Sequence, residues 1–238
     1  MDVFDDKLRV GDIITLEHAK PYEGWLCAED VINSECILKT SNLMLEDCLW
    51  QVCVQHQYSS TSEYEAALIN DHENQEKKKD SDEETPQSIT SAAAAAAPIS
   101  SDSAQKTVQS KAEQKKMQLQ RAAITENLLN KKLMAMKIGK PVAFGDVVQL
   151  LHVKSQTYLT VSSTTLAKQE RENLQVYFDT TGNTMSWLEF MPRYKYDREG
   201  QHISSDTETY IRVHENSSDY IHAARKASKF AINNSKEI

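Results

Sequence analysis

The sequence predicts a mostly β fold, a β-trefoil, into which an α-helical hairpin is inserted. Three observations predict it: a short motif that occurs three times, a tryptophan-containing strand after two of its copies, and a helix-forming segment between the first two copies. Internal repeats of this kind indicate an architecture built from similar supersecondary units. Three four-stranded units around a pseudo-threefold axis would close a small barrel and remove the exposed sheet edges.

Each copy of the motif predicts a β-hairpin. In the first two copies Gly-Asp is followed by two β-branched residues and, six residues after the Asp, by a His. We align His18, His152 and His214. Six or seven residues after each histidine comes an aromatic residue, which is followed directly by Leu or Ile. Alternating apolar residues are typical of strands with one buried face, and the polar segment in between predicts a turn. The copies are GDIITLEHAKPYEGWLCA at 11–28, GDVVQLLHVKSQTYLTV at 145–161 and, less similar, TYIRVHENSSDYIHA at 209–223.

A short apolar strand with a tryptophan follows two of the copies. These strands are expected at residues 47–55 (DCLWQVCVQ) and 185–193 (MSWLEFMPR). Trp50 and Trp187 lie 39 and 42 residues after the glycines that open their copies. Each unit is therefore predicted to contain about four strands and to end on a buried indole.

The third unit begins near Glu208, so the same spacing would place its closing strand close to residue 247. The printed sequence ends at Ile238. We therefore expect the third trefoil lobe to be incomplete.

A helical hairpin is predicted between the first two units. Ser62 to Leu68 favours a short helix, and Ser110 to Glu113 has the spacing of a capping box that opens a second one. Ile124 and Leu128 would share one face of this helix, and Leu129, Leu133 and Met136 another. Gly139 followed by Pro141 is expected to end it.

The segment between the two predicted helices is expected to be disordered. Residues 71–104 contain eight acidic residues, Ser/Thr-rich stretches and six alanines from Ala92 to Ala97. So little apolar surface cannot offset the entropy of ordering the chain. The predicted organisation is a first lobe at 1–60, a helical arm at 61–140 with a disordered insert at 71–109, a second lobe at 141–200 and a partial third lobe at 201–238.

The charge is distributed unevenly. The net charge is −8, yet residues 105–140 contain nine basic and two acidic residues. A basic helix can bind an acidic partner or nucleic acid, but a solvated helix face explains the pattern better, and aromatic residues are not interleaved with the lysines. The N-terminus lacks the apolar run of a signal peptide, and no stretch of 18 apolar residues occurs, so we expect a cytosolic segment that does not insert into a membrane.

No catalytic, cofactor or metal site is predicted. The sequence has no Gly-rich phosphate loop, G-x-S-x-G or H-E-x-x-H motif. Cys27, Cys36, Cys48 and Cys53 are expected to be reduced and buried. A zinc site of Cys48, Cys53 and His56 is the less favoured alternative, because it lacks a second close pair. We expect the three aligned histidines to bond to their own hairpins, although a metal-binding cluster on the threefold axis is an alternative.

Three segments resemble the N-terminal domain of inositol-trisphosphate receptors, the tetrameric calcium-release channels of the endoplasmic reticulum. They are FGDVVQLLHVKSQTYLTV, the run from Glu172 to Lys195, and DCLWQVC from Asp47 to Cys53. The resemblance covers residues 8 to about 70 and 110 to about 226. Ryanodine receptors share this opening domain, and a ryanodine-receptor type is therefore an alternative.

The resemblance implies a MIR-like β-trefoil with a helical arm, called the suppressor domain, on the cytosolic face of the endoplasmic reticulum membrane. It also implies that the ligand binds to the following domains through Arg and Lys clusters. This segment offers no such cluster, and we expect no ligand-binding residues in it. Its expected role is to alter ligand affinity and to couple binding to gating through the adjacent ligand-binding domains and the neighbouring subunits of a homotetramer.

Two other classes of protein use trefoils. A carbohydrate-binding or mannosyltransferase-associated trefoil of the secretory pathway would need a signal peptide or membrane spans. A cytosolic protein-interaction trefoil unconnected with calcium is the second alternative. For the coupling surface, the loop from Ser155 to Tyr158 and the tip of the helical arm are unranked candidates.

Overall fold

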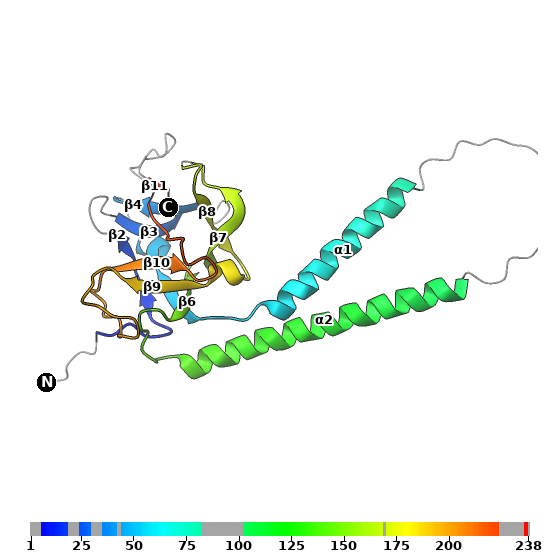
Figure 1. Cartoon of the computed structure of the whole chain (residues 1–238), viewed down its shortest axis with the longest axis horizontal. Coiled ribbons are helices and arrows are strands. Elements are labelled where there is room, and N and C mark those ends of the chain that lie inside the picture. The colour runs from blue at the N-terminus through cyan, green and yellow to red at the C-terminus, as the bar shows by residue number, and fades with distance from the viewer. Residues whose placement is uncertain are drawn as a thin grey trace, which may run out of the picture. The chain divides into compact units, whose positions relative to one another are not determined.

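The computed structural model describes residues 6–18, 24–29, 35–41, 44–81, 102–168, 170–223 and 236–237. The chain divides into two compact units, residues 1–56 with 131–238, and residues 57–130. The first unit contains the strands and the second contains most of the two helices (Figure 1).

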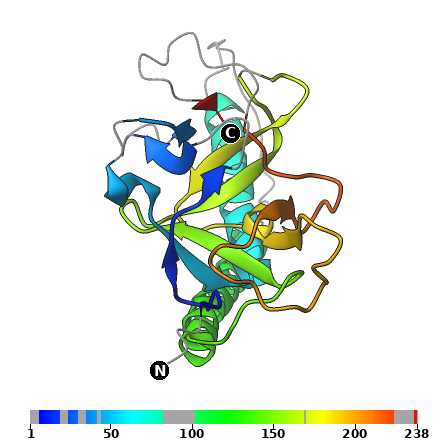
Figure 2. The same cartoon turned by 90° about the vertical axis from the view of Figure 1, so that its left-hand side faces the viewer.

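The first unit is built from two antiparallel sheets (Figures 1 and 2). In the larger sheet β1, β5, β6, β7 and β8 are neighbours in that order, β9 pairs with β6, and β10 pairs with β9. Its strands are β1 (Ile13–Ile14), β5 (Trp50–Val54), β6 (Val147–His152), β7 (Thr157–Leu166), β8 (Leu174–Asp179), β9 (Leu188–Pro192) and β10 (Thr209–Val213). The smaller sheet has the order β11-β4-β3-β2 and consists of β2 (Glu17–His18), β3 (Gly24–Glu29), β4 (Glu35–Lys39) and β11 (Lys236–Glu237). Two short 3₁₀ helices, η1 (Leu45–Cys48) and η2 (Thr184–Ser186), precede β5 and β9. The expectation of a mostly β fold is confirmed.

The three predicted hairpins are present. In the first copy of the motif His18 pairs with Gly24, and in the second His152 pairs with Thr157. In the third copy an antiparallel bridge joins Arg212 to Tyr220. The repeated sequence therefore encodes the same local structure each time.

Large apolar side chains fill the interior of the first unit. Trp50, Val52, Leu150, Leu159 and Leu188 are each at most 1% exposed. They come from β5, β6, β7 and β9, whose alternating side chains point to the same side of the sheet. Burial of each such side chain contributes about 1.5–3 kcal/mol to stability.

A closed ring of backbone hydrogen bonds joins three distant segments of this unit. The N–H of Leu8 donates to the carbonyl of Ile203 (2.8 Å), that of Val142 to Leu8 (2.8 Å), and that of Ile203 to Val142 (3.0 Å). Each of the three segments thus donates one hydrogen bond to one of the other two and accepts one from the remaining segment. All three side chains lie in the core.

The same turn follows each member of this ring. In every turn the backbone N–H of the fourth residue donates to the carbonyl of the first at 3.1 Å. A side-chain oxygen of the fourth residue in turn accepts a hydrogen bond from the N–H of the first at 2.8–3.2 Å. Glycines with φ of 92° and 85° lie in the first two turns, at positions 11 and 145. The turn pairs are Arg9 with Asp12, Ala143 with Asp146, and Ser204 with Thr207. The first two glycines of the motif are therefore needed for their backbone conformation.

The strand registers correct the sequence alignment by one residue. Ile14 lies opposite Trp50, and the equivalent Val148 lies opposite Leu188. Trp50 therefore corresponds to Leu188, and the alignment of Trp50 with Trp187 is wrong. Trp50 is fully buried, whereas Trp187 is only partly buried and donates from Nε1 to the carbonyl of His56 at 2.9 Å.

The alignment of His214 with the other two histidines is wrong for the same reason. Trp50 lies opposite His152, and Leu188 lies opposite Val213. His152 therefore corresponds to Val213, and His214 is displaced by one position. Since neighbouring strand residues point to opposite faces, His214 points away from the core position that His152 occupies.

The two helices are longer than expected. Helix α1 covers Ser59–Ser81, and α2 covers Asp102–Lys137. Residues 71–81 and 102–109, expected in a disordered insert, are helical, and Ser110 lies inside α2 instead of capping it. Gln and Lys, which occur in both segments, favour helix even without an apolar face. The alanine run at 92–97 lies outside the described residues.

The predicted end of the second helix is confirmed. Helix α2 ends at Lys137, and Gly139 has a φ of 79°. The last turn is closed by the N–H of Ile138, which donates to the carbonyl of Met134. Leu133 and Met134 pack on the core of the first unit, whereas Ile124, Leu128, Leu129 and Met136 are more than half exposed. Within the described part of the chain, neither helix is long and apolar enough to cross a membrane.

Candidate interaction surfaces

A buried carboxylate organises the outer face of β9 and β10. Glu189 is 6% exposed and lies opposite Arg212 in the strand ladder. Its Oε2 accepts hydrogen bonds from Nε (2.8 Å) and Nη2 of Arg212, and Oε1 lies 2.5 Å from Nδ1 of His214. Burial alone would raise the pKa of Glu189, but the hydrogen bonds and charges of His214 and Arg212 outweigh burial and lower it. The carboxylate is thus held ionised and fixes both side chains.

An exposed group of two tyrosines, an arginine and a glutamate lies just beyond β9. We call Arg193, Tyr194, Tyr196 and Glu208 the tyrosine patch. The rings of Tyr194 and Tyr196 are stacked, with centroids 5.2 Å apart and planes 7° apart, and Tyr196 is 74% exposed. The guanidinium carbon of Arg193 lies 5.5 Å from the centroid of the Tyr194 ring.

Glu208 joins the patch to the start of β10. Its Oε2 accepts a hydrogen bond from the hydroxyl of Tyr194 (2.8 Å) and forms an ion pair with Arg193 (2.5 Å). The hydrogen bond to Glu208 raises the pKa of Tyr194. One carboxylate therefore orders two side chains that would otherwise move independently.

The local sequence explains why the patch is exposed. Pro192 ends β9, and the polar run that follows turns away from the core, so the Arg-Tyr-Lys-Tyr stretch has no sheet to pack on. Exposed tyrosine and arginine side chains that are already ordered are enriched at protein interfaces, because they bury a large area at a small entropic cost. No role was predicted for this stretch from the sequence; the signal for it is the run of four aromatic or cationic residues directly after the strand.

A second pair of exposed tyrosines lies on the third hairpin. Tyr210 of β10 and Tyr220 are 50% and 46% exposed, and their rings meet edge to face at 6.1 Å. Tyr210 lies opposite Met191 in the ladder, on the same outer face as Glu189. Aromatic surface therefore continues along the outer face of this hairpin.

The aligned histidines have separate roles. His152 is buried, with Nδ1 2.8 Å from the hydroxyl of Ser155 and Nε2 3.1 Å from the carbonyl of Asp47. Burial lowers the pKa of His152, so the ring is neutral at pH 7. The bond to Ser155 matches the expectation that the imidazole holds its own hairpin, whereas the bond to Asp47 reaches η1 and His214 bonds to Glu189 instead. No group of three or more His, Cys, Asp or Glu among the described residues is placed to bind a metal ion.

The expectation of four free cysteines is wrong for two of them. Cys27 of β3 and Cys48 of η1 form a disulfide, with Cα atoms 4.3 Å apart. Cys36 and Cys53 are free and buried; burial raises the pKa of both thiols, that of Cys53 to about 12. The zinc alternative does not fit this structure, because the sulfur of Cys48 is bonded to Cys27.

The loop from Ser155 to Tyr158 is a tight, ordered turn. Gln156 has a φ of 57°, and the Ser155 and Thr157 hydroxyls are 2.5 Å apart. The hydroxyl of Tyr158 lies 3.5 Å from Nδ1 of His56, and burial raises the pKa of Tyr158 to about 12. This loop offers less accessible aromatic surface than the tyrosine patch. The tip of the arm lies outside the described residues.

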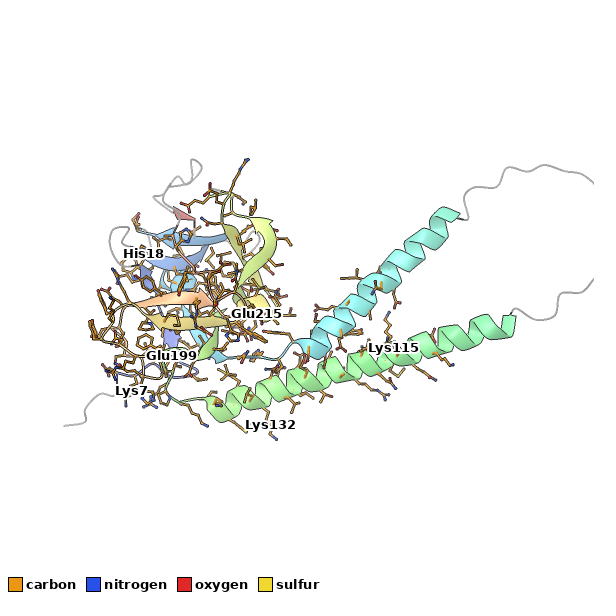
Figure 3. The ribbon with its side chains drawn as sticks, in the orientation of Figure 1. Lys7, His18, Lys115, Lys132, Glu199 and Glu215 are labelled. Atoms are coloured by element: carbon orange, nitrogen blue, oxygen red, sulfur yellow. A yellow bond between two sulfur atoms is a disulfide. The ribbon has the colours of Figure 1, made fainter. Side chains whose placement is uncertain are left out.

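The basic residues of α2 are mostly solvated. Lys115 and Lys132 lie on this helix (Figure 3) and are exposed. Among the basic side chains of α2 that the structure describes, Lys116 differs, since its Nζ pairs with Asp71 of α1 at 2.8 Å. This matches the expectation of a solvated helix face.

Comparison with known families gives one match across nearly the whole chain. The family described as "Inositol 1,4,5-trisphosphate/ryanodine receptor" matches residues 5–237. The inositol 1,4,5-trisphosphate receptor itr-1 of Caenorhabditis elegans is 36% identical over 121 residues, which are 45% of this chain and 4% of that receptor. The chain thus matches a small fraction of the length of this relative.

Two solved structures share the fold at low sequence identity. A Caenorhabditis elegans protein of unknown function has a TM-score of 0.54 at 9% identity and covers 99% of this chain and 89% of its own. The SDF2-like protein from Arabidopsis thaliana has a TM-score of 0.54 at 13% identity and covers 97% and 86%. These likenesses concern the fold alone.

Proposed function

The chain belongs to the inositol 1,4,5-trisphosphate/ryanodine receptor family, and from this we propose that it is the N-terminal regulatory, suppressor-type domain of an intracellular calcium-release channel. In this role the domain alters the ligand affinity of the following domains and couples ligand binding to gating through domain contacts. Reciprocity requires that ligand binding in turn changes how this domain contacts its neighbours. Its proposed location is the cytosolic face of the endoplasmic reticulum membrane.

Within the family, we propose the inositol-trisphosphate branch. The family description covers both receptor types, and the 36% identical relative is an inositol 1,4,5-trisphosphate receptor. The ryanodine-receptor type is the second candidate. Binding of inositol trisphosphate to the whole receptor that contains this segment would separate the two.

We also propose that the first unit is a β-trefoil. The closed ring through Leu8, Val142 and Ile203 supports this, because each segment has the same relation to the next. The turn that follows each member and the ladders of β5 with β6 and β9 with β10 give further support. The lobes would be residues 1–60, 141–200 and 201–238, with the helical arm at 61–140.

The tyrosine patch carries the proposal of a contact surface. Its stacked rings are exposed, and its Arg193 and Glu208 charges are already paired, so a partner can cover the rings without leaving either charge unpaired. Proposed partners are the adjacent ligand-binding domains or a neighbouring subunit of the homotetramer. No contact with nucleic acid is proposed.

The experiment compares Tyr196→Ala with Tyr196→Phe in the whole receptor that contains this segment. The Ala variant removes the most exposed ring, and it should shift ligand affinity toward that of a receptor from which residues 1–238 are deleted. The Phe variant keeps the stacked ring and should behave as wild type. Equal ligand affinities for wild type, Tyr196→Ala and the deletion would refute a regulatory role for this segment.

The segment itself is not proposed to bind inositol trisphosphate. Three phosphates need several convergent cationic donors, and Lys154, Arg193 and Arg212 are each paired with a carboxylate. Calorimetry on residues 1–238 should show no saturable heat. Micromolar binding that is lost on substitution of these cations would contradict this prediction.

A further inference from the structure

Tyr196 differs from the other exposed tyrosines of the described chain. It is 74% exposed, against 39% for Tyr194, 50% for Tyr210 and 46% for Tyr220. The structure gives its side chain a ring contact with Tyr194, but no hydrogen bond from any described residue to its hydroxyl. Its phenol group is therefore the most accessible one in the part of the chain that the structure describes.

The hydroxyls of two of the other exposed tyrosines are already bonded. Tyr194 donates to Oε2 of Glu208 at 2.8 Å. Hydrogen bonds with Glu189 and Tyr220 raise the pKa of Arg212, so the Tyr220 hydroxyl is held by that guanidinium. An enzyme that acts on either hydroxyl must first break its hydrogen bond.

The backbone of Tyr196 lies in a turn. The N–H of Asp197 donates to the carbonyl of Tyr194 at 3.2 Å, and Tyr196 belongs to no strand. Tyr210, in contrast, lies in β10, where it is paired with Met191 in the ladder. A residue in a ladder reaches the active site of an enzyme only after its strand opens, whereas an exposed turn residue needs no such opening. The backbone therefore also favours Tyr196 as the accessible tyrosine.

The ion pair beside Tyr196 is exposed to solvent. Arg193 and Glu208 pair at 2.5 Å, and their side chains are 33% and 45% exposed. The guanidinium carbon of Arg193 and the ring of Tyr196 lie 5.5 and 5.2 Å from the centroid of the Tyr194 ring. The hydrogen bond to Glu208 is the main cause of the raised pKa of Tyr194. The charges of Arg193 and of an ionised Tyr196 act on this pKa as well, so a charged group on the Tyr196 oxygen lies within electrostatic range of the pair.

We propose that Tyr196 is a site of phosphorylation and that the phosphate takes Arg193 from Glu208. A phosphotyrosine carries a charge of about −1.5 to −2 at pH 7 and three acceptor oxygens, whereas a carboxylate has a single charge and two oxygens. Arginine binds phosphate through two parallel hydrogen bonds. Because the existing ion pair is exposed and therefore weak, the guanidinium changes its partner at little cost.

The co-substrate of this modification is ATP, and the enzyme is a protein tyrosine kinase. The phenol oxygen of Tyr196 attacks the γ-phosphorus of ATP, and the bond between that phosphorus and the leaving oxygen of ADP breaks. The phenol proton passes to a carboxylate base of the kinase. The products are ADP and the phosphate monoester of Tyr196, so atoms and charge balance.

The consequence for the receptor rests on the proposed function of the tyrosine patch. A partner that covers the Tyr196 ring would also have to cover the phosphate, and removing such a charge from water is costly. Glu208 would be left without its cation at the same surface. Phosphorylation of Tyr196 therefore opposes the contact, and the contact in turn shields Tyr196 from the kinase.

The first test measures which tyrosine is modified. Residues 1–238 are incubated with ATP and the catalytic domain of a protein tyrosine kinase, and the initial rate at each tyrosine is measured by mass spectrometry. Each rate is divided by the rate for a synthetic peptide of the same local sequence, residues 190–202 or 204–216, which removes the kinase's own sequence preference. Tyr196 should then be modified at least about tenfold faster than Tyr210, whose strand must open first.

The second test locates the phosphate. A neighbouring guanidinium favours the dianion, so the second ionisation constant of the phosphate, followed by ³¹P nuclear magnetic resonance, should fall at least about twofold in Arg193→Gln. Lys195→Gln removes another exposed cation next to Tyr196 and should have a smaller effect. Circular dichroism checks that both variants fold.

Three results would overturn the proposal. They are equal corrected rates at Tyr196 and Tyr210, an ionisation constant that Arg193→Gln leaves unchanged, and an equal decrease of that constant in Arg193→Gln and Lys195→Gln. None of these measurements involves the whole receptor or its ligand. The receptor experiment with Tyr196→Ala can therefore refute the contact function while Tyr196 is still modified as proposed, and the two failures are distinguishable.

Discussion

At the residue scale, the carboxylate of Glu126 holds the first turn of α1. It accepts hydrogen bonds from the backbone N–H groups of Ser60 and Thr61 and from the hydroxyls of Ser59 and Thr61, at 2.8–3.0 Å. Glu126→Gln should lower the free energy required to open this turn locally by about 1–3 kcal/mol, because an amide has only one acceptor oxygen. Hydrogen exchange at the Ser60 and Thr61 amides measures the change. Glu113→Gln, at an exposed position of the same helix, is the control and should have no effect.

The same carboxylate predicts a pH dependence. Burial acts to raise the pKa of Glu126, but the four hydrogen bonds outweigh it and hold the pKa below its ordinary value of 4.5. The stabilisation is therefore fully present above about pH 4.5 and is lost as the pH falls through the folded-state pKa. Exchange at the Ser60 amide should accelerate, beyond the intrinsic pH effect, as the pH falls below about 4.5 and through the lowered pKa of Glu126. Glu126→Gln should remove this dependence; an unchanged profile would contradict the assignment.

Glu189 and Glu208 each pair with an arginine but differ in burial. Glu189→Gln should lower the free energy of unfolding by about 3 kcal/mol or more, because Arg212 would remain half-buried beside a neutral group. Glu208→Gln should lower it by less than about 1 kcal/mol, since its pair with Arg193 is exposed to solvent. Urea unfolding of both variants tests the comparison. Equal losses would show that the Glu189 cluster does not stabilise the fold.

At the element scale, the sequence predicted where α2 ends but not where either helix begins. Gly139 ends α2 because only glycine adopts a φ of 79° without strain, and this requirement is visible in the sequence. The start of α1 depends on Glu126, 67 positions away from Ser59, and no local pattern shows that contact. Ser110 has the spacing of a cap yet lies inside α2, because helix-forming residues continue on both sides of it.

Gly139→Ala tests the helix end. A methyl group at Gly139 would meet no atom within 4 Å, so only the backbone conformation opposes the change. The variant should lose about 1 kcal/mol of stability, and Gly139→Asn should lose less, because Asn tolerates this conformation better. Thermal unfolding measures both. An Ala variant as stable as wild type would show that α2 can end differently.

The hairpins were predictable and the exact correspondence of the units was not. Alternation and turn residues identified all three hairpins, because these signals are local. By residue type Trp50 aligns with Trp187, yet the ladders pair Ile14 with Trp50 and the equivalent Val148 with Leu188. The register of a strand is set by which of its faces is buried. A tryptophan can lie on either face when its indole N–H donates to a carbonyl, as those of Trp50 and Trp187 do.

At the scale of the whole molecule, the sequence missed a covalent link. Cys27 and Cys48 are 21 residues apart and were expected to be free, because the cysteine spacing carries no signal for pairing. Under non-reducing, denaturing conditions two of the four thiols should react with a thiol reagent. A reductant should lower the stability of the folded chain by about 3 kcal/mol, the value for a loop of this length. The Cys27→Ser, Cys48→Ser variant should be insensitive to reductant; four reactive thiols in the wild type would contradict the bond.

The tyrosine patch also could not be predicted from the sequence. Its members are close because Glu208 reaches back to Arg193 and Tyr194 across the connection between β9 and β10. Nothing in the sequence shows that Arg193 and Tyr194 share the carboxylate of Glu208. The family resemblance, in contrast, was visible in contiguous motifs, and the family match over residues 5–237 confirmed it.

The ring through Leu8, Val142 and Ile203 has a consequence for biosynthesis. A ribosome adds residues in order, so Leu8 leaves the exit tunnel long before Ile203 has been made. Until then the nascent chain has two members of a three-membered ring and no means of closing its interior. Loops this long close slowly, and the emerging polypeptide should therefore depend on chaperones until the segment that contains Ile203 has left the ribosome.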